Sequence, residues 1–305
     1  MATVERPHKV VLVTGCTDGG AGAAMAREFH RRHHRVFATS TDGLKMQSLA
    51  DAGITTLALD VTSQASIDQA ASLVRDAAHG KIDMLINNAA VFNVMPLVDV
   101  DLENGRKLFD VNFFGVLAVI QTFLPLLMAT DGPGLIANVS SMSATMCPAW
   151  QGMYAASKAA LLAMGNILRV ELAPFGVQVV TVMSGGVDTA GKQASKQQNA
   201  KVPHNSIYSP LAPYIETNDA GVRRKGMPPA EYAKQVVDSL LRPHPKPWIW
   251  KGAFAWLAWL LTCFGWMGML DGVQIKAAHL DRIGMLNVDG HAKECSGFEV
   301  DKLKE

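Results

Sequence analysis

Tyr154 and Lys158 stand four residues apart in the segment YAASK, and a helix would place them on the same face. The phenol of a free tyrosine has a pKa of about 10, so it exchanges protons poorly near neutral pH. A neighbouring ammonium group would stabilise the phenolate and lower that pKa. The other tyrosines, Tyr208, Tyr214 and Tyr232, have no lysine four residues later. The pair therefore indicates proton transfer to or from a substrate oxygen.

A glycine-rich loop joins an apolar run to a helical pattern in the segment VLVTGCTDGGAGAAMAREF. Its glycines are Gly15, Gly19, Gly20 and Gly22, a spacing that does not fit the dinucleotide fingerprint G-x-G-x-x-G. Glycines allow positive φ and close approach of a ligand to the backbone, and the following helix begins with free N–H groups. The loop can therefore hold phosphate groups, although a tight turn alone would use the same glycines.

The elements that must position these groups alternate along the first 190 residues. Strands are expected to begin at Val10, Arg35, Thr55, Asp83, Gly134 and Val177, and helices to span 21–32, 63–78, 102–128 and 153–175. Apolar strands separated by helices are typical of a parallel sheet covered on both faces. We predict an α/β fold, a Rossmann-type doubly wound parallel sheet of about seven strands, in a single domain with a C-terminal helical extension.

Polar or glycine-rich clusters follow every predicted strand: TGCTDGGAG, TST, DVT, NNAA, SSMS and SGGVDT. In a doubly wound sheet the ligand binds outside the carboxyl ends of the strands. One such cluster is ordinary loop composition. Six of them at one edge of the sheet indicate a ligand-binding site there.

Asn112, Ser141, Tyr154 and Lys158 resemble, in order and spacing, the catalytic tetrad of the short-chain dehydrogenases/reductases. The glycine loop resembles the TGxxxGxG motif of that family with one residue extra, a longer form similar to that of a fungal branch. NNAA resembles the family's NNAG, and SGGVDT resembles its PGxVxT with Ser184 in place of proline. The resemblance covers residues 9–189 and, more loosely, the remainder.

The resemblance implies hydride transfer between a nicotinamide coenzyme and a carbonyl or alcohol carbon. Tyr154 would give or take the proton of the oxygen, and Lys158 would lower its pKa and hold the nicotinamide ribose. Ser141 would hydrogen-bond the reacting oxygen, and Asn112 would hold a water that links Lys158 to solvent. The implied coenzyme contacts are Gly15, Thr17, Gly20, Gly22, Thr39, Ser40, Thr41, Asp60, Asn88, Lys158, Val187 and Thr189.

The end of the second strand favours NADP(H) over NAD(H). NAD enzymes with this architecture usually carry an acidic residue there that binds the ribose hydroxyls. This chain has Thr39, Ser40 and Thr41, whose hydroxyls can bond to a 2′-phosphate that a carboxylate would repel. Asp18 in the glycine loop and the lack of an arginine after the strand argue in the other direction.

Residues 9–190 are expected to form the dinucleotide-binding and catalytic core, and 191–245 the substrate-loop region. Cys147, Trp150 and Gln151, between Ser141 and Tyr154, are candidates to line the pocket. Packed core is an equal alternative for Trp150.

Residues 246–305 are expected to form the last strand, PWIWKG, and an apolar C-terminal cap. Residues 252–270 carry no charge over nineteen positions, the length of a minimal membrane span. Glycines interrupt the run, which favours a pocket roof or a contact in a homo-oligomer, ahead of peripheral membrane attachment and a true span.

Charge balance, cysteine spacing and the N-terminal sequence indicate which partners, metals and cellular location to expect. Positive and negative charges nearly balance, and no basic run suggests a nucleic-acid partner. The cysteines show no metal-ligand spacing, so no metal is expected; they are Cys16, Cys147, Cys263 and Cys295. No signal peptide is recognised before Lys9, which predicts a cytoplasmic protein, with association with the endoplasmic reticulum or lipid-droplet membrane as a further expectation.

The expected activity is NADP(H)-dependent oxidoreduction of a ketone or secondary alcohol of a hydrophobic small molecule. The fungal branch that the sequence resembles contains 1-acyldihydroxyacetone-phosphate reductase and natural-product tailoring reductases. A natural-product ketone, polyketide or polycyclic, or a lipid ketone is favoured, and acyl-dihydroxyacetone-phosphate reduction is the alternative. A redox-neutral isomerase or cyclase, or a non-catalytic NADP(H)-binding protein, remains open because one fold hosts many functions.

Overall fold

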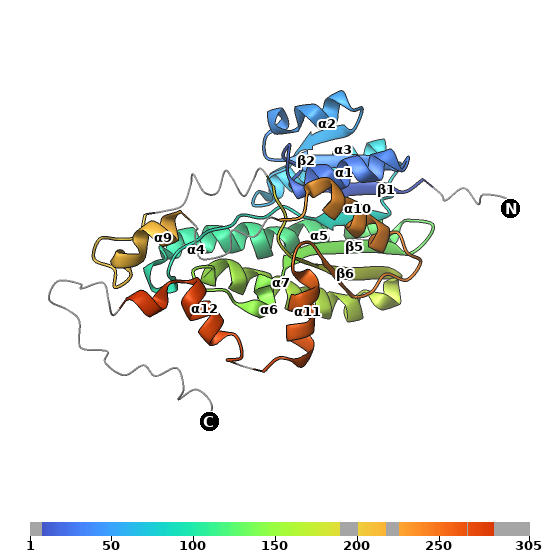
Figure 1. Ribbon diagram of the computed structural model, residues 1–305. Coiled ribbons are helices and arrows are strands. Elements are labelled where there is room, and N and C mark those ends of the chain that lie inside the picture. The colour runs from blue at the N-terminus through green and yellow to red at the C-terminus, as the bar shows by residue number, and fades with distance from the viewer. Residues whose placement is uncertain (1–7, 190–200, 218–225, 267, 284–305) are drawn as a thin grey trace.

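The computed structural model describes residues 8–189, 201–217, 226–266 and 268–283. Seven parallel strands form one sheet in the order β3-β2-β1-β4-β5-β6-β7 (Figure 1). The strands are β1 (Val10–Val13), β2 (Arg35–Ser40), β3 (Thr55–Ala58), β4 (Met84–Asn87), β5 (Gly134–Ser141), β6 (Val177–Ser184) and β7 (Trp248–Lys251). The predicted fold class is confirmed, and all six predicted strands and the seventh, PWIWKG, are present.

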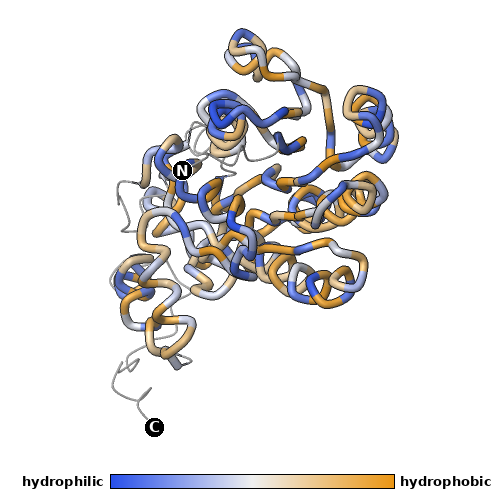
Figure 2. Tube along the Cα trace, turned by 90° about the vertical axis from the view of Figure 1, so that its right-hand side faces the viewer, coloured by the Kyte–Doolittle hydropathy of each residue, from blue (hydrophilic) through white to orange (hydrophobic). Residues whose placement is uncertain are grey.

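Helices cover both faces of the sheet. One face carries α1 (Ala21–Arg31), α2 (Gln47–Asp51) and α10 (Pro229–Leu240); the other carries α3 (Gln64–Ala77), α5 (Gly115–Met128) and α7 (Gly152–Glu171). Strands β4 and β5 are buried along their whole length, as strands with helices on both faces must be. Figure 2 shows the matching pattern: the central strands are mostly hydrophobic, whereas the helices carry both hydrophobic and hydrophilic residues.

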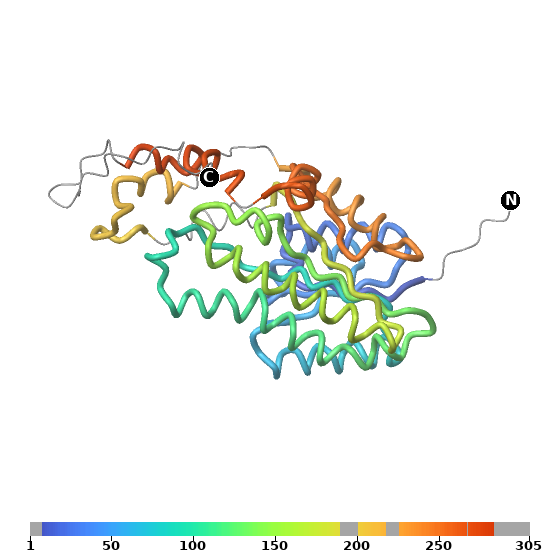
Figure 3. The backbone as a smooth tube through the Cα atoms, turned by 90° about the horizontal axis from the view of Figure 1, so that it is seen from below, coloured from blue at the N-terminus to red at the C-terminus, as the bar shows by residue number. Residues whose placement is uncertain are grey.

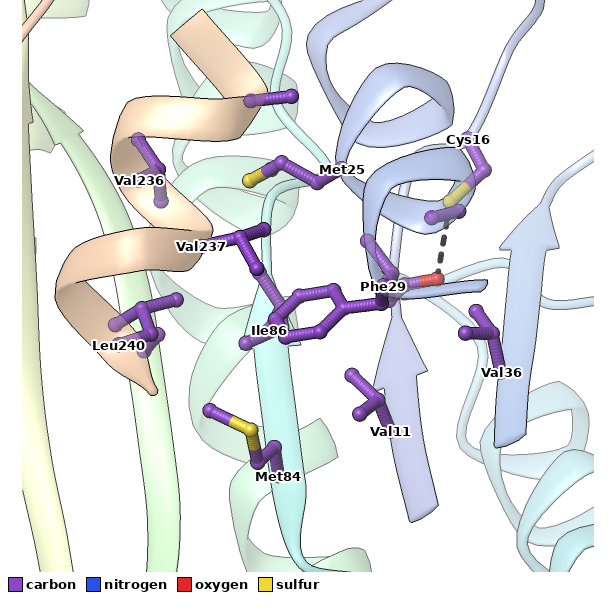
Figure 4. Close-up of a cluster of buried hydrophobic side chains, with 14 of the residues drawn as sticks. Val11, Cys16, Met25, Phe29, Val36, Met84, Ile86, Val236, Val237 and Leu240 are labelled. Atoms are coloured by element: carbon purple, nitrogen blue, oxygen red, sulfur yellow. Dashed lines mark hydrogen bonds between the residues drawn. The ribbon is translucent and has the colours of Figure 1, made fainter. Parts of the chain in front are cut away.

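The core on the α1 side is built around Phe29 (Figure 4). Its ring, which is fully buried, lies between Val237 of α10 and the side chains of Val11 and Met84 on two neighbouring strands. The 3.6-residue spacing of apolar residues in α1 gives that helix one buried face. This packing fixes where α1 begins, and with it the position of the glycine loop.

The predicted helix over 102–128 consists of α4 (Leu102–Phe109), a π-helical turn (Asp110–Phe114) and α5. By length and hydropathy it is the one helix within the described ranges that could cross a membrane, and 44% of its most apolar window is buried inside the protein. α5 packs on α3 and the sheet, which accounts for that composition.

The uncharged run 252–270 does not form one helix. It contains α11 (Ala255–Phe264), which is ten residues long, and ends before α12 (Asp271–Ala277). Gly265 takes an extended conformation and terminates α11. A helix of ten residues is shorter than the roughly 20 residues that a bilayer requires.

A small separate core lies at one end of the molecule, away from the sheet. Here α9 (Ala212–Glu216) and the residues after α12 lie side by side (Figures 1 and 3). The members of this satellite core are Val94, Met95, Trp150, Val202, Leu211, Ile215 and Ala278. Residues 190–200 and 218–225 of the predicted substrate-loop region, and Cys295, lie outside the described residues.

Candidate active site

The glycine loop between β1 and α1 is packed against the residue that follows β4. Gly15 has φ +71°, and a Cβ placed on it would lie 2.7 Å from the backbone of Ala89. A Cβ on Gly22 would lie 2.5 Å from the side-chain amide of Asn88. Both glycines are therefore required for the loop to pack, whatever ligand it binds.

Asn88, which was expected to contact the coenzyme, stabilises this loop through its side-chain amide. Its Nδ2 donates hydrogen bonds to the carbonyl oxygens of Thr14 (2.9 Å) and Gly15 (3.0 Å). In return, Thr14 Oγ1 accepts hydrogen bonds from the backbone N–H groups of Asn88 (3.0 Å) and Ala89 (3.1 Å). Sequence reasoning missed Thr14, although a buried hydroxyl at the end of a strand is a common sign of such a bond.

The start of α1 fits a phosphate group. Gly20 is its N-cap and provides no side-chain acceptor, and no acidic residue lies in the first turn. A helix end without a side-chain cap leaves N–H groups and a positive dipole end available to an anion. Thr17 is exposed in the loop, 3.5 Å from Ser40 as measured between the hydroxyl oxygens. These residues could hold the pyrophosphate of a dinucleotide.

The three hydroxyl residues at the end of β2 are not equivalent. Thr39 is buried and donates to the Val13 carbonyl oxygen at 3.3 Å, and Ser40 is also buried. Thr41 is exposed and is the member of the three that a 2′-phosphate could reach from solvent. The carboxylate of Asp18 accepts hydrogen bonds from the backbone and hydroxyl of Ser48 in α2, so it serves to hold α2 to the glycine loop.

Asp60 and the loop after β6 complete the predicted coenzyme contacts at this edge. Asp60 Oδ1 accepts hydrogen bonds from the backbone N–H (2.9 Å) and hydroxyl (2.7 Å) of Thr62, which fixes the turn after β3. Val187 pairs with Met227 in an isolated bridge, and the N–H of Thr189 donates to the Val187 carbonyl at 3.1 Å. These backbone bonds fix the position of residues 187–189 at the start of the loop.

Tyr154 and Lys158 project from the first two turns of α7 toward Ser141 at the end of β5. Lys158 is buried, and its Nζ donates to the Val139 carbonyl oxygen at 2.9 Å and lies 5.8 Å from the centre of the Tyr154 ring. The Ser140 hydroxyl donates to the backbone carbonyl oxygen of Lys158 at 3.0 Å, which holds this turn of α7 against β5. The predicted Ser141, Tyr154 and Lys158 group is thus brought together at the carboxyl edge of the sheet.

Burial controls the proton affinities of this group. Burial raises the pKa of Tyr154, and the hydrogen bond from Ser141 opposes that rise. Burial also lowers the pKa of Lys158 to about 8, because the protonated amine has one carbonyl partner in a dehydrated position. Burial therefore outweighs the lowering of the Tyr154 pKa that the neighbouring lysine was expected to produce.

The side chain of Asn112 is fully engaged with protein groups. Its Oδ1 accepts from the N–H of Val91 at 2.9 Å, and its Nδ2 donates to the Val91 carbonyl and to Ser157 Oγ, both at 3.0 Å. It lies in the π-helical turn, where the bulged backbone brings it against α7. The side chain therefore ties α7 to the loop after β4, and Ser157 is a member of this network that the sequence did not reveal.

Phe92 closes one side of Tyr154. The two rings meet edge to face with their centroids 4.8 Å apart. This contact limits rotation of the phenol and excludes water from that side of the ring. No pattern in the sequence distinguishes Phe92 from the other ten phenylalanines.

The three predicted pocket residues lie in different surroundings. Trp150 is buried in the satellite core, where its ring meets that of Tyr208 edge to face at 5.0 Å. Gln151 Oε1 accepts from the Ser143 hydroxyl at 3.1 Å. Cys147 is exposed and lines a mostly apolar cavity of about 770 Å³ between the α6 segment (Ser143–Met146), α11 and α12. The structure thus supports the packed-core alternative for Trp150.

Comparison with known proteins agrees with this geometry. The short chain dehydrogenase family matches residues 9–200. Short-chain dehydrogenase PC-15 from Penicillium crustosum is 41% identical over 236 residues, which cover 77% of this chain and 85% of that protein. The NADPH-dependent 1-acyldihydroxyacetone phosphate reductase of Schizosaccharomyces pombe is 42% identical over 213 residues, which cover 69% of this chain and 71% of that protein.

A solved short-chain dehydrogenase from Burkholderia cenocepacia, in complex with NADP, superimposes with a TM-score of 0.68 at 26% identity. The superposition covers 87% of this chain and 96% of that chain. The glycine loop, the tyrosine and lysine on one helix turn and the serine at the adjoining strand end all lie within the matched range. The chain is an oxidoreductase that belongs to the short-chain dehydrogenase family.

Proposed function

We propose that the protein reduces a ketone of a hydrophobic substrate to a secondary alcohol with NADPH, and catalyses the reverse reaction with NADP⁺. The observation that supports this proposal is the meeting of Ser141, Tyr154 and Lys158 at the sheet edge, beside an uncapped helix start that fits a phosphate. Carbonyl reduction requires a proton donor, a hydrogen-bond donor to the developing oxyanion and a binding site for the coenzyme, and these groups lie at one place.

Each side chain has a definite task in this proposal. When bound, the nicotinamide supplies or accepts the hydride. Ser141 donates a hydrogen bond to the carbonyl oxygen as negative charge develops, and Tyr154 transfers its phenolic proton to the same oxygen. Lys158, held by the Val139 carbonyl, carries a positive charge close to the phenolate that remains and stabilises it.

Thr41 is proposed to determine the preference for NADPH, because it is the exposed hydroxyl at the end of β2. Replacing Thr41 with aspartate would place a carboxylate against the 2′-phosphate and offer it instead to the ribose hydroxyls of NADH. We expect kcat/KM for NADPH to fall about 100-fold and that for NADH to rise, as measured in parallel titrations with a single ketone. Equal changes for both coenzymes would exclude this assignment, and Thr55→Asp, at an exposed position of β3, is the control.

The substrate is proposed to be an apolar ketone. The cavity beside Cys147 is lined by Leu261, Met269 and Ile275 among other described residues, but not by Ser141 or Tyr154. In this proposal it holds an apolar extension of a substrate whose carbonyl lies at Tyr154. Two classes of substrate fit these surroundings, a polyketide or polycyclic ketone and a lipid ketone. A screen of both classes together with an acyl-dihydroxyacetone phosphate, read as oxidation of NADPH, would distinguish them.

We also propose that α11 and the turn after it contact a lipid surface. Trp256 (67%), Phe264 (74%) and Trp266 (70%) are exposed on a segment without charge, and Lys276 is exposed on the adjacent α12. Tryptophan and phenylalanine beside a cation are typical of helices that lie in the membrane interface. Peripheral attachment would bring the cavity next to a source of hydrophobic substrate.

The Trp256→Ser/Phe264→Ser variant of the full chain should bind vesicles of phosphatidylcholine and phosphatidylserine at least about tenfold more weakly, because two of the most exposed aromatic side chains of the segment are lost. Co-sedimentation measures this binding. The control is Leu44→Ser, which removes an exposed apolar side chain from the 3-10 turn (Gly43–Met46) after β2. Unchanged vesicle binding together with a fall from dimeric to monomeric mass would show that a second copy covers this surface instead.

A further inference from the structure

Gln274, in the middle of α12, forms two hydrogen bonds with the loop that joins β5 to α7. Its Nε2 donates to the carbonyl oxygen of Met146, and its Oε1 accepts from the N–H of Ala149, both at 3.2 Å. The two ends of one amide thus bind two backbone groups of opposite polarity, 128 and 125 positions earlier in the chain. A single side chain therefore connects the C-terminal helices to the middle of this loop.

The middle of the loop has an irregular backbone that these bonds hold in place. Cys147 follows α6 in the left-handed conformation (φ 44°, ψ 56°), and Trp150 has φ 66°. Such conformations are unfavourable for residues with a side chain, so surrounding contacts must impose them. Among the described residues, the Met146 carbonyl and the Ala149 N–H have no hydrogen-bond partner other than Gln274.

The same loop begins at Ser141 and leads to Tyr154. Near its start, the N–H of Ser143 donates to Ser141 Oγ at 3.1 Å. The hydroxyl of Ser143 donates to Gln151 Oε1 at 3.1 Å, which joins the start of the loop to its end. The two ends are therefore held by bonds within the loop, whereas the middle is held from outside by Gln274.

The middle of the loop is also one wall of the cavity of about 770 Å³ beside α11 and α12. Met146 and Cys147 line it from the loop, and Gln274 lines it from α12. A second polar contact joins α6 to α11, where the hydroxyl oxygens of Thr145 and Thr262 lie 3.1 Å apart. These contacts fix the distance between the walls of the cavity.

We propose that Gln274 is a positioning residue that determines specificity for ketones with a long apolar chain. It holds residues 146–149 against α12, so that the cavity has its shape before the chain of the substrate enters. A wall that is ordered in advance is not ordered at the expense of binding, so affinity for the chain rises. This inference rests on the proposed function, in which the carbonyl lies at Tyr154 and an apolar extension of the substrate occupies the cavity.

Gln274→Met keeps the length of the side chain and removes both hydrogen bonds. Methyl ketones from butanone to methyl nonyl ketone, assayed with NADPH, measure the contribution of the chain. In the wild type we expect kcat/KM to rise about fourfold for each methylene group that enters the cavity. In the variant we expect kcat/KM for methyl nonyl ketone to fall about tenfold through KM, with kcat and the values for butanone unchanged.

The matched control is Gln47→Met, the same substitution at an exposed residue of α2 whose side chain bonds to Asp51. It should leave the dependence on chain length as it is in the wild type. Gln274 is partly exposed, so its replacement is compatible with folding. A general loss of stability would lower the activity with butanone and methyl nonyl ketone alike, which the comparison of the two ketones detects.

Hydrogen exchange of the peptide 143–153, followed by mass spectrometry, tests the same contact without turnover. The Ala149 N–H loses its acceptor in Gln274→Met, so we expect it to exchange about tenfold faster. Methyl nonyl ketone, added with NADP⁺, should slow this exchange in the wild type and much less in the variant.

A wild-type protein that reduces no ketone would contradict the proposed function, and the exchange measurement would still test the role of Gln274. Equal slowing of exchange by methyl nonyl ketone in the wild type and the variant would overturn the inference. So would a folded Gln274→Met variant that discriminates between butanone and methyl nonyl ketone as the wild type does.

Discussion

Replacing Tyr154 with phenylalanine is expected to lower kcat for ketone reduction by about 10³-fold and to leave the Kd for NADPH within about twofold of the wild-type value. The ring that packs against Phe92 is retained, so the pocket keeps its shape while the transferable proton is lost. Steady-state kinetics at saturating NADPH give the first quantity, and quenching of coenzyme fluorescence gives the second. Tyr214→Phe, which removes a hydroxyl from α9, is the matched control.

The same variant separates the competing functions. Turnover that survives Tyr154→Phe while NADPH still binds would rule out proton donation by this phenol and would favour a redox-neutral reaction in the same pocket. Coenzyme binding without turnover of any ketone, in the wild type as well as the variant, would favour a binding protein. The reductase proposal requires wild-type turnover and its loss with this single oxygen atom.

Replacing Lys158 with methionine is expected to abolish activity and to stabilise the fold. The pKa of Lys158 is lowered from 10.5 to about 8 by burial, and each pH unit of such lowering corresponds to about 1.4 kcal/mol. Loss of the hydrogen bond to the Val139 carbonyl offsets about 1 kcal/mol of the gain. The free energy of unfolding at pH 7 should therefore rise by about 2 kcal/mol.

The stability gain of Lys158→Met is expected to decrease as pH rises. Below pH 8 the lysine is protonated in both the folded and the unfolded chain, so the wild type carries the full penalty of the buried charge. Between pH 8 and 10.5 the unfolded chain binds more protons, so the wild type gains stability as pH rises and the advantage of Lys158→Met disappears. Urea denaturation at pH 7 and pH 10 measures the difference, with the exposed Lys45→Met as the control.

A stability gain at pH 7 that persists unchanged at pH 10 would show that packing of methionine, and not removal of a buried charge, stabilises the variant. A variant less stable than the wild type at pH 7 would show that the Val139 contact outweighs desolvation of the amine. Either outcome would contradict the explanation that burial of the ammonium group lowers the pKa of Lys158.

The architecture was predictable because it is encoded by periodicity over many residues. Most strands of the sheet are runs of apolar and β-branched residues, and the end of each run marks a turn at the sheet edge. The order of Ser141, Tyr154 and Lys158 was equally readable, because a strand end and one helical turn determine their places. The roles of these residues remain predictions that the variants above will test.

What the sequence did not reveal depends on single hydrogen bonds. Nothing in the spacing distinguishes Thr39, which is buried and bonded to Val13, from the exposed Thr41 two residues later. Likewise, Asn88 and Asn112 match family motifs, yet their amides are satisfied by backbone groups of the protein. Such assignments depend on contacts between residues that are 20 to 75 positions apart, which pattern alone does not specify.

The satellite core around Trp150 connects the C-terminal segments to the catalytic half of the molecule. None of its members belongs to a strand, and the segments that it joins, 201–217 and 268–283, stabilise one another. Phe92 lies against this core, and its ring also meets that of Tyr154, so the C-terminal segments and the catalytic tyrosine are in contact through one side chain. Substitutions at sites that share a contact do not combine additively. A change of sequence in either segment can therefore displace the Tyr154 phenol, and a chimaera with exchanged segments would have to be assayed for kcat as well as KM.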